Sequence, residues 1–402
     1  MSTIAVIGTL DSKGHEHAFV AELIRQRGHQ ALLIDLGTGD EPVIEPDITR
    51  FEVAAAAGVD LQPLLERHDR GECVVAMSQA IPFLLEKLAS EGKIHGVISL
   101  GGGGGTALAT AGMRTLPLGF PKLMVSTLAS GNTAHYLGTK DIAMMPAIVD
   151  VAGLNRISRM VFSRAAAAIC AMVETPIEST ESKPIIVASM FGNTTECINH
   201  AKEVLENADY EVLVFHATGA GGKAMEDIIA SGMVSGVLDV TTTEWADEYV
   251  GGTLGAGPTR LDAAALAGVP TVIAPGCLDM VNFGAKETVP EKFAERNFYI
   301  HNPQVTLMRT SAEESAELGK IIAEKANHYK VPITLMIPEK GISVISEKGQ
   351  PFYDAAADEA LFQAIHQHAK IPVISLPETI NSHSFAIACA EQLLENIKLS
   401  NQ

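Results

Sequence analysis

Short apolar runs alternate with amphipathic helical patterns along almost the whole chain. In the first 37 residues, "TIAVIG" and "QALLIDLG" have the length of strands, and "EHAFVAELIRQRG" between them repeats its apolar positions with the period of a helix. Later runs such as "HGVISL", "PIIVAS" and "PTVIAP" are continuously apolar rather than alternating, as strands covered on both faces are. The pattern predicts an α/β fold with mostly parallel sheets.

A polar, turn-rich segment, "VETPIESTESKP", separates two apolar blocks and predicts a domain boundary between Val173 and Pro184. The chain has 402 residues, more than the roughly 250 to 300 at which one hydrophobic core stops growing. The strand, polar turn, helix and strand pattern of the amino terminus then begins again. We therefore expect two Rossmann-like three-layer domains, 1–178 and 184–402, with a diverged duplication as a hypothesis and the segment from Val305 completing the second sheet.

Composition excludes several classes of protein. We find no apolar run of about 18 residues and no basic leader before the first strand, so we expect a cytoplasmic protein without a membrane partner. Its five cysteines are scattered and form no CxxC pair, which argues against a disulfide framework and a structural zinc site. The net charge of -19, without a cluster of Lys and Arg, excludes nucleic acid as a partner.

Ligands of open α/β sheets bind outside the carboxyl ends of the strands, so the residues that follow each apolar run are candidates. The first half offers three such loops, "TLDSKG", "GGGGGT" and "STLASGNT". The glycine run precedes a helical pattern, permits positive φ and close approach of the backbone, and places an anion at a helix amino terminus. We predict a phosphate cradle there, with a tight turn that serves packing as the alternative. The run fits neither the Walker A motif nor the dinucleotide fingerprint. The candidate nucleotide-binding residues are Thr9, Gly101, Gly102, Gly103, Gly104, Gly105, Thr106, Ser130, Gly131 and Asn132.

Two charged residues follow the first strand. Asp11 is a candidate metal ligand or a helix N-cap, and Lys13 is a candidate phosphate contact. For Ser130, Gly131 and Asn132 a plain turn is the alternative. The neighbouring "GHEH" is interpreted as a solvated first turn.

The second half carries more polar groups at its predicted strand ends. His216, Lys223, Asp239, Glu244 and Asp279 each follow a strand, so we expect them to converge on one crevice where opposed charges shift each other's pKa. Of these, the candidate catalytic residues are Lys223, Asp239, Glu244 and Asp279. A structural or solvated role is the alternative for each.

One pattern favours another class of enzyme. Gly219, Gly221 and Ala224 satisfy a permissive dinucleotide fingerprint, and Asp239 follows at the next strand end. This is the second strand-to-helix turn of its domain rather than the first, so a dinucleotide-dependent oxidoreductase is a minor alternative.

The loops together resemble a known family. "GGGGGTALATAGMRTLPLGFPKLMVSTLASGNT", "VFHATGAGGKAMEDI", "DVTTTEWADE", "PGCLDMVNFG" and "HNPQVTLMRT" are similar to the tobamovirus-resistance-protein-like ATP-binding family, over nearly the whole chain. The resemblance implies two Rossmann-like domains, binding of ATP with a divalent ion such as Mg²⁺, and a homodimer. In the plant resistance protein a TIM-barrel domain follows the similar region, which suggests a separate TIM-barrel protein as a partner here.

These observations lead to two hypotheses of different classes. The first is a nucleotide-dependent enzyme that binds ATP in its first domain and a small-molecule substrate in the second domain or between the domains. The second is an ATP-responsive binding or scaffold module without turnover. Release of a product would distinguish the enzyme from the scaffold module.

Overall fold

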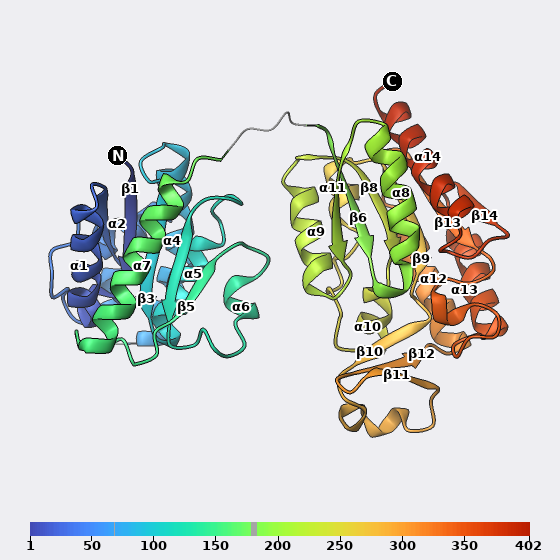
Figure 1. Ribbon diagram of the computed structural model, residues 1–402. Coiled ribbons are helices and arrows are strands. Elements are labelled where there is room, and N and C mark those ends of the chain that lie inside the picture. The colour runs from blue at the N-terminus through green and yellow to red at the C-terminus, as the bar shows by residue number, and fades with distance from the viewer. Residues whose placement is uncertain (68, 178–182) are drawn as a thin grey trace. The chain divides into compact units, whose positions relative to one another are not determined.

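The computed structural model describes residues 1–67, 69–177 and 183–402. The chain forms two compact units, Met1–Ser179 and Thr180–Gln402, each a three-layer α/β structure around a parallel sheet (Figure 1). The predicted fold class is therefore confirmed. Part of the predicted boundary segment, 178–182, lies outside the described residues.

In the described part of the first unit, five parallel strands form a sheet in the order β2-β1-β3-β4-β5. The strands are β1 (Thr3–Gly8), β2 (Gln30–Asp35), β3 (Gly96–Gly101), β4 (Lys122–Ser126) and β5 (Ala143–Pro146). The helices are α1 (Leu10–Gln26), α2 (Arg50–Ala56), α3 (Gln62–Glu66), α4 (Arg70–Ser90), α5 (Gly103–Met113), α6 (Ala134–Leu137) and α7 (Arg156–Glu174).

Two buried clusters fix the layers of this unit. Val20 and Phe162 place α1 and α7 on one face of the sheet, against Ile4 and Ile98. The other face is covered by α2, α4 and α5. Among the described residues, α4 alone is long and apolar enough to cross a membrane, but it packs in this core through residues such as Ile81, and it contacts α2 and α5.

The second unit repeats this strand order and extends it by one strand, in the order β14-β13-β9-β8-β6-β7 among the described residues. A small antiparallel sheet, β10-β12-β11, is inserted after β9 and lies beyond one end of the large sheet (Figure 1). The strands are β6 (Ile185–Met190), β7 (Glu211–His216), β8 (Val234–Thr241), β9 (Thr271–Gly276), β10 (Met280–Phe283), β11 (Phe298–Asn302), β12 (Val305–Arg309), β13 (Ile333–Pro338) and β14 (Val373–Leu376).

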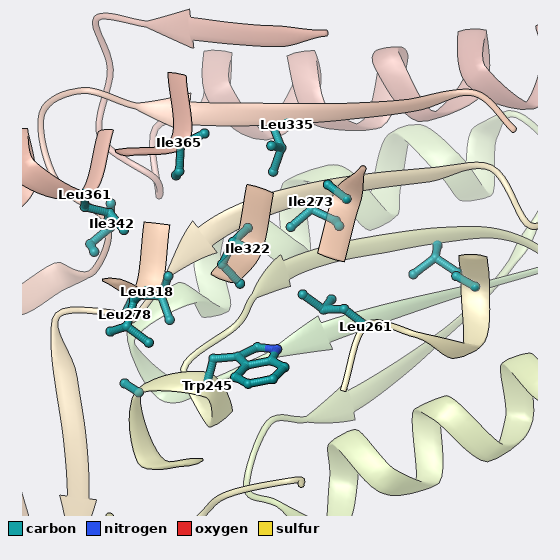
Figure 2. Close-up of a cluster of buried hydrophobic side chains, with 14 of the residues drawn as sticks. Trp245, Leu261, Ile273, Leu278, Leu318, Ile322, Leu335, Ile342, Leu361 and Ile365 are labelled. Atoms are coloured by element: carbon teal, nitrogen blue, oxygen red, sulfur yellow. The ribbon is translucent and has the colours of Figure 1, made fainter. Parts of the chain in front are cut away.

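Helices cover both faces of the large sheet here too. They are α8 (Thr195–Asn207), α9 (Ala220–Ala230), α10 (Glu244–Val250), α11 (Ala263–Ala267), α12 (Ala312–Ala326), α13 (Ala355–His368) and α14 (His383–Ser400), with single turns η1 (Gly192–Thr194), η2 (Lys286–Thr288), η3 (Glu291–Phe293) and η4 (Val344–Ser346). Figure 2 shows part of the larger core, where Trp245, Leu261 and Ile322 gather against Ile273 of the sheet. The opposite face is covered by α8 and α14.

One element differs from the prediction. The segment from Val305 completes the large sheet through β13 and β14 as expected, but its first strand, β12, pairs antiparallel with β10 and β11 instead. An apolar run carries no information about its pairing partner, so the sequence pattern could not separate these two sheets.

Candidate functional site

The first unit has a reversal of strand order between β1 and β3. These strands are neighbours, and the helices that follow them, α1 and α5, lie on opposite faces of the sheet. At such a point the two connections diverge and leave a crevice outside the carboxyl ends of the strands. The loops that flank this point begin at Thr9 and at Gly102, both of which the sequence singled out.

The glycine run forms the amino terminus of α5. Gly102 is the N-cap, and Gly103 and Gly104 are exposed in the first turn of the helix. None of the five glycines has a positive φ, so of the two expected reasons for the run, positive φ and close approach of the backbone, only close approach remains. At Gly101 a Cβ would lie 3.1 Å from the backbone of Gly105, so close packing requires that glycine.

Packing does not explain the exposed glycines. A Cβ on Gly103 would meet nothing closer than Leu128 Cδ1 at 3.8 Å, and a Cβ on Gly104 would meet nothing within 4 Å. Glycine costs about 1 kcal/mol relative to alanine inside a helix. The fold therefore keeps the first-turn backbone of α5 bare without an internal steric reason.

Thr106 has a different role from the glycines before it. It is buried, and its hydroxyl lies 2.7 Å from the Ser126 hydroxyl, which also accepts the Leu128 N–H. The Thr106 side chain thus joins α5 to the end of β4 and is not open to a phosphate.

The carboxylate of Asp11 holds the loop after β2. Its Oδ2 accepts the backbone N–H groups of Thr38 and Gly39, at 3.1 and 2.9 Å. Its Oδ1 is buried and has no hydrogen-bond partner among the described residues. Asp11 lies in the first turn of α1, which begins at Leu10, so the expected polar turn is already helical.

A magnesium ion held by a nucleotide needs only one or two protein carboxylates, because the phosphates and water complete its shell. The free Oδ1 of Asp11 fits that requirement. The described residues contain no group of three or more His, Cys, Asp and Glu side chains that could hold a metal ion alone.

Other side chains of α1 anchor the loop after β5. Lys13 Nζ donates to the Val151 carbonyl, and Glu16 accepts the Gly153 N–H. Lys13 is therefore committed within the protein rather than free for a phosphate. His17 is buried and accepts the Leu100 N–H, so "GHEH" is not the solvated turn that we expected.

Two cavities open beside these loops. One, of about 640 Å³, is lined by Thr9, Asp11, Arg50, Phe51 and Arg70. Sequence analysis missed the last three, because they follow β2 through a long connection and no motif marks them. Arg50 is 3% exposed and donates to the Gly39 carbonyl, so it fixes the same loop as Asp11.

The other cavity, of about 560 Å³, is lined by Thr127, Ser130 and Ile148. Gly131 closes a turn by donating to the Leu128 carbonyl, and Asn132 accepts the Ala134 N–H at the start of α6. Of the predicted "SGN" triplet, Ser130 faces this cavity and the other two shape the turn.

Ile148 has an unusual backbone. Its φ is 67°, and its side chain is 76% exposed. The hydrogen bond from the Val149 N–H to the Ala147 carbonyl closes a γ-turn at Ile148. With a positive φ this is the rare, strained form of that turn, and it is most unfavourable for a β-branched residue.

The predicted catalytic carboxylates of the second unit are buried. Arg260, 1% exposed, lies between them, with its Nη2 2.7 Å from Asp239 Oδ1 and its Nε 2.7 Å from Glu244 Oε2. Glu226 also accepts from the guanidinium, at 3.2 Å. Burial opposes the charge of Arg260, but the three carboxylates outweigh it and raise the arginine's pKa.

This ion network occupies the second glycine-rich turn. Glu244 Oε1 accepts the backbone N–H groups of Gly219 and Gly222 at the amino terminus of α9, at 2.6 and 3.0 Å. The protein's own carboxylate thus holds the position that a pyrophosphate takes in a dinucleotide site. The fingerprint at Gly219, Gly221 and Ala224 has a structural explanation.

Asp279 and Lys223 lie apart from that network. Asp279 is buried, accepts from the Ser343 hydroxyl at 2.8 Å, and has its pKa raised by burial against the opposing effect of Arg309. Lys223 is exposed on α9. The expectation that His216, Lys223, Asp239, Glu244 and Asp279 converge on one crevice was therefore wrong, because the three carboxylates are buried in two separate networks. Any catalytic role for them stays a prediction.

Comparison with known proteins gives consistent matches along the chain. Models of the N-terminal and C-terminal domains of an uncharacterised protein family (UPF0261) match residues 2–178 and 183–397. A UPF0261 protein of Clostridium tetani is 49% identical, covering 97% of this chain and 98% of that protein. The ToMV resistance protein Tm-1(GCR237) of Solanum lycopersicum is 38% identical over 97% of this chain, which spans only 55% of the plant protein.

Solved structures add no functional argument. A UDP-N-acetylglucosamine 2-epimerase from Rickettsia bellii aligns over 100% of this chain and 96% of its own, with 11% identity and a TM-score of 0.24. At that level of similarity the match says nothing about the ligand.

Proposed function

The chain belongs to the UPF0261 family, and from this premise we propose that its first domain binds ATP with Mg²⁺ at the carboxyl ends of β1, β3 and β4. The observation that carries the proposal is the bare first turn of α5, where Gly103 and Gly104 are exposed and neither φ nor packing requires a glycine. A phosphate that approaches these backbone N–H groups needs the space that a side chain would occupy.

The second domain supplies an internal comparison. Its glycine-rich turn also begins a helix, but there a Cβ on Gly221 would lie 1.9 Å from the His216 carbonyl oxygen, and one on Gly222 would lie 2.1 Å from Glu244. Packing explains these glycines without a ligand, but it explains neither Gly103 nor Gly104 of α5. This contrast favours the first domain as the nucleotide site.

The remaining parts of the proposed site follow from the loops around α5. The α5 N–H groups bind the phosphates, and the free Oδ1 of Asp11 would contact Mg²⁺. When bound, the ion would neutralise phosphate charge. Thr9 and Ser130 line the cavities on either side, which leaves room for the nucleoside in one of them.

We further propose an ATP-dependent enzyme that acts on a small molecule, working in the cytoplasm as a homodimer, with a separate TIM-barrel protein as a partner. The family resemblance supports these points. The alternative is a scaffold module that binds ATP without forming a product. A dinucleotide-dependent oxidoreductase is disfavoured, because Glu244 fills the turn that such a cofactor would need.

Calorimetry with ATP and Mg²⁺ on the full chain tests the proposal. We expect Gly103→Val and Gly104→Ala to fold and to lose nucleotide affinity by about tenfold or more, because one charge-assisted hydrogen bond contributes about 1.5 to 3 kcal/mol. Gly192→Ala is the matched control, since Gly192 also has open space around its Cα but lies in η1 of the second domain. Unchanged affinity in the α5 variants with loss in Gly192→Ala would place the site in the second domain.

Product analysis on the same preparation separates the enzyme from the scaffold. Release of ADP, AMP or a modified small molecule supports an enzyme. Stoichiometric binding of ATP that stays intact, without any product, supports the scaffold.

A further inference from the structure

A cavity of about 730 Å³ lies in the second domain, away from the ion network around Arg260. Ile337 of β13, Ser375 of β14 and several residues of α13 line it. This position, outside the carboxyl ends of two parallel strands, is where α/β sheets bind ligands, and the volume is within the range of small-molecule sites. We call it the α13 cavity.

Charged groups of both signs line the α13 cavity without neutralising each other. Glu339 and Glu347 lie on its wall together with Lys340 and Lys348. Within the described parts of the chain, none of these four side chains has an ion-pair or hydrogen-bond partner. Because no Lys and Glu of this set lie within ion-pair distance of each other, each charge is left for a ligand.

One carboxylate of the cavity is fixed in place. Asp358 is 9% exposed, and its Oδ1 accepts from Arg309 Nη2 at 2.6 Å. Arg309 is itself held, because its Nε donates to the Phe352 carbonyl at 2.8 Å. Burial raises the pKa of Asp358 to about 6, whereas the ion pair with Arg309 favours the carboxylate form.

Apolar and aromatic surface completes the lining. Phe362 is nearly buried, and the ring of Tyr353 is about half exposed at the same cavity. An aromatic face attracts an ammonium group and also packs against a short carbon chain. The lining therefore combines carboxylates, ammonium groups and aromatic rings.

We propose that the α13 cavity binds a zwitterionic small molecule of the amino-acid class, with its ammonium group on the unpaired carboxylates of Glu339 and Glu347, beside Asp358, and its carboxylate on Lys340 and Lys348. A dication would leave the two lysines facing a positive charge, and a dianion would place a negative charge against the carboxylates. Only a ligand that carries one positive and one negative group matches both the carboxylates and the lysines of the lining. Binding here is independent of the nucleotide proposed for the first domain.

Three probes of equal chain length test this charge pattern on the full chain by calorimetry, without nucleotide. They are ε-aminocaproate, hexamethylenediamine and adipate, and thermal shifts with the standard L-amino acids extend the set. We expect zwitterions to bind about tenfold or more tightly than the diamine and the dicarboxylate, as for the loss of one charge-assisted contact. No binding by any zwitterion, or equal binding of either matched probe, overturns the proposal.

Variants locate the site. Ala355 is exposed and lines the cavity, so Ala355→Trp should block binding without unfolding the protein. The double variant Lys340→Gln with Lys348→Gln should reverse the preference from ε-aminocaproate to hexamethylenediamine, because only the carboxylates remain. Lys320→Gln, a partly exposed lysine of α12 outside the cavity, is the control and should bind like the parent protein. If the double variant keeps its preference for the zwitterion, the proposal is wrong.

Discussion

A Cβ added to Gly222 would lie 2.1 Å from Oε2 of Glu244, whose Oε1 accepts the Gly222 N–H at 3.0 Å. The Glu244 carboxylate thus occupies the space at the start of α9 that a side chain at position 222 would need. Because Oε2 of Glu244 also accepts from Arg260, any movement of Glu244 disturbs the buried ion network.

Gly222→Ala is expected to destabilise the second domain. The added methyl group must displace Glu244 from Arg260, and breaking a buried ion pair costs about 3 to 5 kcal/mol. Chemical denaturation, monitored by hydrogen exchange of second-domain amides, measures the loss of stability. Gly104→Ala, which adds the same methyl group in open space at α5, should instead leave stability unchanged or raise it by up to about 1 kcal/mol. Equal effects of the two variants would show that the clash is relieved without disturbing Glu244.

Asp239→Asn is expected to reduce stability while ATP binding stays unchanged. Asp239 is 1% exposed and receives two guanidinium N–H groups of Arg260, so the amide leaves part of the arginine unpaired at a cost of about 3 kcal/mol or more. Asp262→Asn is the matched control, because the Asp262–Lys325 pair is partly exposed and should contribute less than about 1 kcal/mol. A stable Asp239→Asn protein that binds ATP but forms no product would instead assign Asp239 to catalysis.

The buried carboxyl group of Asp247 predicts a pH dependence of stability. Burial raises its pKa to about 6, although hydrogen bonds from Asn282 oppose that shift. The unfolded chain has a value near 3.9 for aspartate, so between about pH 4 and pH 6 the folded state binds more protons than the unfolded state. Stability from this group is present below pH 4 and is lost as the pH rises through 6, by on the order of 3 kcal/mol.

Asp247→Asn should remove that dependence, since an amide does not titrate over this range. Urea unfolding of the second domain from pH 4 to pH 7 compares the two proteins. We expect the free energy of unfolding of the parent to fall relative to the variant as the pH rises. Parallel profiles would mean that Asp247 ionises alike in both states.

The cysteines are expected to be unreactive in the native protein. All five are buried, and burial raises the pKa of each thiol, to about 12 for Cys197. The thiolate is the reactive form, so iodoacetamide should modify the native chain slowly and the urea-unfolded chain at all five positions. Mass spectrometry counts the adducts. Rapid native labelling at Cys73, Cys170, Cys197, Cys277 or Cys389 would indicate local opening at that residue.

Local patterns correctly predicted the parallel strands and the helix that begins at the glycine run, because a buried strand and a helix amino terminus leave traces within a few residues. They missed β5, whose four residues are exposed or half-buried and show no apolar run. They also could not identify Arg260 as the partner of Asp239, since 21 residues separate the two and nothing local to Arg260 marks it. Whether a carboxylate at a strand end faces solvent or a buried arginine depends on such distant partners.

The strained turn at Ile148 has a consequence for the cavity that it lines. A backbone in so sparsely populated a region costs about 1 to 3 kcal/mol, and an exposed side chain returns little of that through packing. The neighbouring residues Val151 and Gly153 are tied to α1, so the loop cannot relax without releasing those ties. This wall of the cavity is therefore held in a strained conformation. A ligand that allows the backbone of Ile148 to reach a more favourable φ would gain affinity from that relaxation as well as from its contacts with the protein.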